Sequence, residues 1–148
     1  MKSVASVLIL LLFAGVTSQG QSIDSLKLTG KEIPGGYTLS EENYCISVQP
    51  RTLYNNPELF EALLGKVKRK DIQNFKSRDD RGCIMYFEFD DEFKGEGFLG
   101  AYLWGEDKPS KMHPETYAAK KNILVIWSFN SGSEIKKVSE DKVKTLLK

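Results

Sequence analysis

The sequence contains few of the residues that most enzymes use. Among its 148 residues there is one histidine, His113, and there are two cysteines, Cys45 and Cys83. The cysteines are too far apart for a Cys-x-x-Cys redox centre, and a single histidine makes a zinc site a poor expectation. No serine lies in the Gly-x-Ser-x-Gly turn that carries the nucleophile of many hydrolases. These absences favour a protein that binds over one that catalyses.

Other absences narrow the class of protein further. The chain has no Asn-x-Ser/Thr site, so a glycosylated surface protein has no support. After the N-terminal segment no apolar stretch is long enough to span a membrane, and we expect no lipid-anchor signal at the charged C-terminus. Charge is balanced at 21 Lys+Arg against 20 Asp+Glu, and the basic cluster at 66–70 contains no aromatic residue. We therefore expect no nucleic acid as partner.

The N-terminal segment has the three parts of a secretory signal peptide. Lys2 gives a positive start, residues 4–14 form an apolar run, and small and polar residues follow. The run is too short for a bilayer, which takes about 20 apolar residues. We expect residues 1–18 to be removed, with cleavage after Gly20 or an uncleaved anchor as the alternatives. This predicts export to the periplasm or the extracellular space, a single domain over 19–148 and no stable membrane anchor.

Export makes a disulfide the default state of Cys45 and Cys83. Each cysteine begins a strand-like run, so a bridge between neighbouring strand ends is geometrically plausible. Closing a loop of this length stabilises a protein by roughly 4 kcal/mol in the chain-entropy model. Two buried free thiols are the alternative.

The second half of the chain predicts a sheet with helices against it. Residues 83–89 alternate with strand periodicity, and residues 98–104 and 123–129 are apolar on both faces if extended. Helices are predicted from Asn56-Pro57 to Leu64 and at the C-terminus, where Ser139 is a candidate cap. Together these predict an α+β fold, a small antiparallel sheet of three to five strands with two or three helices packed on one face.

The first half is less regular. Residues 19–33 alternate weakly and fit either a lead-in strand or a loose arm. Residues 44–48 read as a short strand that stops before Pro50. Residues 66–76 fit either a strand or a polar helix. These segments decide whether the second face of the sheet is covered.

Aromatic residues on the predicted strands are the best candidates for binding. Tyr102 and Trp104 would point the same way from 98–104, and Trp127 lies on 123–129. An open aromatic face would bind a peptide, a sugar or an apolar ligand. The alternative is a sheet buried on both sides, because aromatic residues dominate ordinary cores.

His113 is the one candidate for acid–base chemistry. Glu115 follows it closely, and the pair could exchange protons or, with Glu106 and Asp107, surround a metal. No nucleophile accompanies the histidine, and the carboxylate spacing matches no defined metal site. A histidine that packs within a loop is the alternative.

We therefore expect a small exported non-catalytic binding or interaction protein. Its candidate binding residues are Tyr102, Trp104, Trp127 and His113, its ligand is an unidentified protein or small molecule, and no cofactor is expected. Two alternatives stay open. One is a small hydrolase-like or metal-assisted enzyme that uses the His113/Glu115 loop. The other is a structural accessory subunit of an envelope or secreted assembly.

Overall fold

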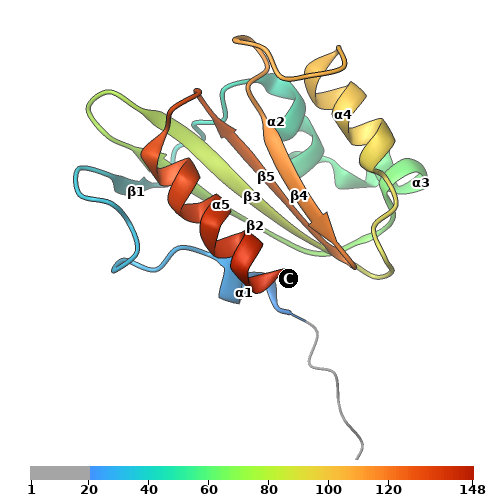
Figure 1. Cartoon of the computed structure of the whole chain (residues 1–148). Helices are drawn as coiled ribbons and strands as arrows, with labels where there is room; N and C mark the ends of the chain where they lie inside the picture. The colour runs from blue at the N-terminus through green and yellow to red at the C-terminus, as the bar shows by residue number, and fades with distance from the viewer. Residues whose placement is uncertain (1–20) are drawn as a thin grey trace, which may run out of the picture.

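Five strands form one antiparallel sheet in the order β1-β2-β3-β5-β4 (Figure 1). The computed structural model describes residues 21–148, and the expected signal peptide lies outside them. The α+β class and the antiparallel sheet are thereby confirmed. The strands are β1 (Thr38–Ser40), β2 (Val67–Lys76), β3 (Arg81–Phe89), β4 (Thr116–Lys120) and β5 (Ile123–Phe129).

Helices cover both faces of the sheet (Figure 1). One face carries the short α1 (Ile23–Leu26) and the C-terminal α5 (Glu134–Leu146). The other carries three α-helices together with the 3-10 turn η1. Both faces of the sheet are therefore covered. The helices of the second face come from the segment between β1 and β2 and from the segment between β3 and β4. They are α2 (Val48–Asn55), η1 (Pro57–Phe60), α3 (Glu61–Leu64) and α4 (Glu96–Trp104).

Two apolar cores, one on each side of the sheet, explain the sequence pattern of the central strands. On β3, Ile84 and Tyr86 join the core under α1 and α5, while Met85 and Phe87 join the core under the other helices. Successive side chains of a strand point to opposite faces, so a strand between two cores is apolar throughout. All seven residues of β5 are buried for this reason.

The segment predicted as a strand at 98–104 is wrong, because these residues belong to α4. Short apolar runs do not distinguish a strand from a buried helix by periodicity alone. In the helix the buried pair is Leu99 and Leu103, four residues apart on one face. Gly105 ends the helix with a left-handed backbone, φ 66°, which favours glycine.

Three other local predictions need correction. Residues 44–48 do not form a strand, since α2 begins at Val48. Within the segment 19–33, which the sequence predicts as a strand or a loose arm, residues 23–26 instead form α1. Its buried Ile23 and Leu26 pack on the sheet. Ser133, not Ser139, caps α5 by accepting a hydrogen bond from the backbone N–H of Lys136. The ambiguous segment at 66–76 is a strand, β2.

No helix within residues 21–148 is long and apolar enough to cross a membrane.

Candidate functional site

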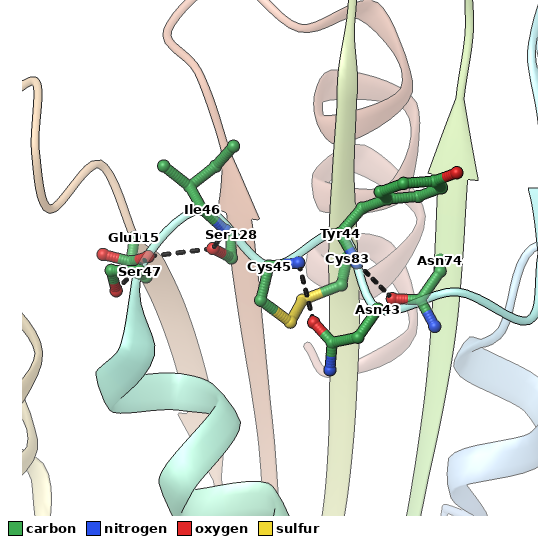
Figure 2. Close-up of a disulfide and its surroundings, with 9 residues drawn as sticks. All are labelled: Asn43, Tyr44, Cys45, Ile46, Ser47, Asn74, Cys83, Glu115 and Ser128. Atoms are coloured by element: carbon green, nitrogen blue, oxygen red, sulfur yellow. Dashed lines mark hydrogen bonds between the residues drawn. A yellow bond between two sulfur atoms is a disulfide. The ribbon is translucent and has the colours of Figure 1, made fainter.

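The predicted disulfide is confirmed. Cys45 and Cys83 are bonded, with their Cα atoms 5.0 Å apart, and the bond ties the loop before α2 to the start of β3 (Figure 2). Two backbone hydrogen bonds hold the same loop. The Tyr44 N–H donates to Asn74 Oδ1 at 3.2 Å, and the Ile46 N–H donates to Ser128 Oγ at 2.8 Å. This loop, residues 41–47, which we call the Tyr44 loop, is thereby anchored on β2, β3 and β5.

Glu115 is fully buried beside this loop (Figure 2). Its Oε1 accepts hydrogen bonds from Ser47 Oγ at 2.7 Å and from Ser128 Oγ at 2.8 Å, and its Oε2 has no partner within the described residues. The carboxylate therefore connects the N-terminus of α2 to β5. It does so without a lysine or arginine in ion-pair contact in this part of the chain.

His113 does not share a site with the acidic residues that the sequence places near it. It is half-buried, its backbone N–H donates to Ser110 Oγ, and its Nδ1 is buried with no hydrogen-bond partner among residues 21–148. Glu106 and Asp107 are exposed and line a hollow along α4 that includes neither His113 nor Glu115. Among residues 21–148 no group of three His, Cys, Asp or Glu side chains could hold a metal ion.

The three aromatic candidates are separated by the fold. Trp127 is 1% exposed, and its indole N–H donates to Ser139 Oγ on α5 at 2.8 Å. Tyr102 and Trp104 lie on α4 and are half-buried. The Tyr102 hydroxyl donates to the backbone carbonyl of Gln49, and the Trp104 indole donates to that of Glu115. Only Tyr102 and Trp104 are therefore accessible to a ligand.

Exposed apolar residues of η1 and α3, together with the Tyr102 ring and its aromatic neighbours, form what we call the α3–α4 patch. The exposed fractions of Leu59 and Leu63 are 70% and 54%. The rings of Phe60 and Phe98 lie 4.9 and 5.8 Å from the Tyr102 ring, measured between centroids. In one regular helix over 56–64, Leu59 and Leu63 would lie four residues apart on the same apolar face. Only Leu64 is buried there, because η1 and α3 are too short to turn four apolar residues toward one core. The patch comprises Leu59, Phe60, Leu63, Phe98 and Tyr102.

A second surface, the Trp104 hollow, lies along α4 and has a volume of about 270 Å³. The rings of Trp104 and Tyr117 are stacked, with centroids 5.9 Å apart, and the Tyr117 hydroxyl donates to the backbone carbonyl of Glu96. A Cβ at Gly100 would come within 3.2 Å of the Trp104 ring, so glycine leaves the space that this ring occupies. The carboxylates at the hollow are those of Glu96, Glu106 and Asp107.

The segments that form both surfaces are acidic, although Lys66 lies beside Glu58 and Glu61 in a hollow at the start of β2. Residues 57–65 and 95–107 carry five carboxylates and no basic side chain. None of the five forms an ion pair within the part of the chain that the structure describes. Burial raises the pKa of the Tyr117 phenol, and the neighbouring Glu96 carboxylate raises it further. The negative end of the α4 dipole at Gly105 adds to the same field.

A third surface, the Tyr44 hollow, lies at the β2–β3 hairpin and has a volume of about 350 Å³. Lys76 and Arg81 are directly opposite each other on β2 and β3, and each lies 6.0 Å from the centre of the Tyr44 ring. The hollow is lined by Tyr44, Lys76, Ser77, Arg78, Asp79, Asp80, Arg81 and Asn130.

Comparisons with protein families, with curated proteins and with solved structures find no match for this chain. Its function must therefore be inferred from its own residues.

Proposed function

We propose that this protein is an exported, non-catalytic binding protein that docks a basic protein partner on the α3–α4 patch. The observation that carries the proposal is the exposure of Leu59 and Leu63 beside a cluster of three aromatic rings. Contiguous exposed apolar surface rimmed by polar residues is typical of interaction sites. Covering a leucine side chain completely gains about 2 kcal/mol, so a partner that seals both leucines gains substantial affinity.

The charge of the same segments defines the partner. The five carboxylates of residues 57–65 and 95–107, which form no ion pair within residues 21–148, favour an apolar segment that is flanked by lysine or arginine. The Trp104 hollow fits one such flanking residue, because stacked aromatic rings and nearby carboxylates both attract an ammonium or guanidinium group. A partner of this kind would bind less tightly as salt concentration rises.

Export rests on the N-terminal pattern and on the disulfide. Disulfides persist in the periplasm and outside the cell, whereas cytosolic reductants keep thiols reduced. The bonded pair Cys45–Cys83 is thus consistent with an oxidising compartment.

The enzyme alternative has less support. The Glu115 carboxylate is buried and bound by two serine hydroxyls, and the acidic residues Glu106 and Asp107 line another surface. A general acid or base must lie within hydrogen-bond reach of the proton that it transfers, and the fully buried Glu115 carboxylate is out of reach of a substrate at the surface.

Two synthetic helical peptides test the proposal, both with the same leucine face, one with lysine and one with glutamate at the polar positions. We expect the purified protein to bind the lysine peptide only, with NMR shift changes confined to α3 and α4. Serine in place of Leu59 and Leu63 should weaken binding about tenfold or more, since each truncation removes buried apolar area. Leu39→Ser is the matched control, because Leu39 on β1 is 53% exposed and lies outside the patch. Equal binding of both peptides, or an equal loss with Leu39→Ser, would contradict the proposal.

A further inference from the structure

Lys76 and Arg81 are paired across the β2–β3 hairpin without a carboxylate partner in the described part of the chain. Like charges directly opposite each other on neighbouring strands destabilise a sheet. Neither side chain forms an ion pair within residues 21–148, and their nearest aromatic neighbour is the Tyr44 ring that they share. Two cations that share one aromatic ring and have no carboxylate in ion-pair contact among the described residues would be stabilised by a bound anion.

Both charges point to the same side of the sheet. Residues two apart on a strand share a face, so Arg81 lies on the face of Cys83, and Lys76 lies on the face of Asn74. That face carries the disulfide and the Tyr44 loop (Figure 2).

Three carboxylates lie near the hollow, and each has a partner other than Lys76 or Arg81. Asp80 Oδ2 accepts hydrogen bonds from the hydroxyls of Tyr37 and Ser133, which approach from the side of α5. Asp79 lies 3.9 Å from Arg78 in an exposed ion pair at the hairpin tip. Glu42 accepts a hydrogen bond from the Tyr44 hydroxyl at 2.5 Å. None of these contacts involves Lys76 or Arg81, so their N–H groups can donate to a ligand.

The Tyr44 ring is held in place before any ligand arrives. Its backbone N–H is bonded to Asn74 Oδ1, Asn74 itself is buried, and the next residue in the chain is the disulfide-bonded Cys45 (Figure 2). A fixed ring between two cations costs little ordering entropy on binding.

We infer that the Tyr44 hollow binds an organic oxyanion, a ligand of sugar size that carries a carboxylate or phosphate group. Arginine holds such a group through two parallel N–H donors, and lysine adds a point charge. A volume of about 350 Å³ exceeds one oxyanion and falls in the range of small-molecule sites. The exposed part of the Tyr44 ring would pack against the apolar face of the ligand. This site is separate from the α3–α4 patch and does not depend on the proposed partner.

Titration with four probes tests the inference: glucuronate, glucose 6-phosphate, inorganic phosphate and uncharged glucose. We expect the two acidic sugars to bind, with NMR shift changes at Tyr44 and the hairpin, and glucose not to bind. If the phosphate group alone provides the affinity, inorganic phosphate will match glucose 6-phosphate. That result would leave an oxyanion site but overturn the sugar-sized ligand. Equal binding of glucose, or no binding by any acidic probe at millimolar concentration, would overturn the site itself.

Substitutions separate binding from folding. Lys76→Gln and Arg81→Gln should each weaken binding of the acidic sugars about tenfold, the ratio expected from loss of one charged hydrogen bond. The same changes should leave the unfolding midpoint unchanged or raise it, because they remove like-charge repulsion. Lys137→Gln is the control for net charge, since Lys137 is exposed on α5 and lies outside the hollow. An equal effect of Lys137→Gln would overturn the assignment to this site.

Discussion

The carboxylate of Glu115 lies 2.7 Å from the hydroxyl of Ser47, and both side chains are buried where α2 meets the sheet. Ser128 on β5 donates to the same carboxylate oxygen and also accepts the N–H of Ile46. This chain of bonds, with the disulfide, determines the path of the loop that carries Tyr44. Glu115, which the sequence offered as an acid–base partner for His113, here bonds to two serine hydroxyls and holds the loop on the sheet.

Truncation of Glu115 should therefore destabilise the protein, while an isosteric amide should not. Glu115→Ala leaves two buried hydroxyls without an acceptor and a cavity, and we expect a loss of about 3 kcal/mol in the free energy of unfolding. Glu115→Gln keeps an oxygen for both hydroxyls and removes a buried charge, so we expect a change of about 1 kcal/mol or less. Urea unfolding of the three proteins measures this. Equal losses for both variants would show that the charge itself is required.

The disulfide should contribute most of the stability of the Tyr44 loop. Cys45 and Cys83 are separated by 38 residues, and a loop of this length corresponds to about 4 kcal/mol in the chain-entropy model. The double variant Cys45→Ser/Cys83→Ser should unfold at a lower urea concentration by that amount. Dithiothreitol should lower the midpoint of the parent protein to that of the variant and leave the variant unchanged. If dithiothreitol left the urea midpoint of the parent protein unchanged, the disulfide would not provide this stability.

Glu32 should make the stability depend on acid pH. Its side chain accepts hydrogen bonds from Lys142 on α5 and from Thr29, and these lower its pKa from 4.5 to about 2. A carboxyl whose pKa is lower in the folded state stabilises the fold above its unfolded pKa. Stability is lost as the pH falls from about 4.5 to 2. Because the pair is partly exposed, we expect only about 1 kcal/mol.

The matched variant for this prediction is Glu32→Gln. Urea midpoints measured at pH 6 and pH 2.5 should differ less for the variant than for the parent, with the variant less stable only at pH 6. A parallel pH dependence in both proteins would assign the acid sensitivity to other carboxyls.

Sequence periodicity was sufficient for the centre of the sheet. The residues of β3 and β5 are apolar on both faces because each strand lies between two cores, and this pattern is local. The same pattern misassigns 98–104, since Leu99 and Leu103 fit a strand and a helix equally well in a short segment. Only the packing of α4 across Met85 and Phe87 decides between them.

The candidate sites depend on contacts that no local pattern contains. Lys76 faces Arg81 because the hairpin register pairs them, and that register follows only once 66–76 is a strand. Tyr44 reaches this pair through a disulfide and a bond to Asn74, both between residues far apart in sequence. The exposed positions of Leu59 and Leu63 depend on how far the short η1 and α3 turn. The one signal available beforehand is the absence of basic residues in 57–65 and 95–107.

The two tryptophans should respond differently to charged quenchers, which makes fluorescence a direct probe of the Trp104 hollow. Trp127 is buried and bonded to Ser139, whereas Trp104 is half-buried beside Glu96, Glu106 and Asp107. In Trp127→Phe, which retains Trp104, caesium ions should quench more strongly than iodide because the local carboxylates attract cations. In Trp104→Phe neither ion should quench appreciably. The preference for caesium should decline with added potassium chloride, since salt screens exposed charges. Stronger quenching by iodide in Trp127→Phe would remove the electrostatic basis for a basic partner at this surface.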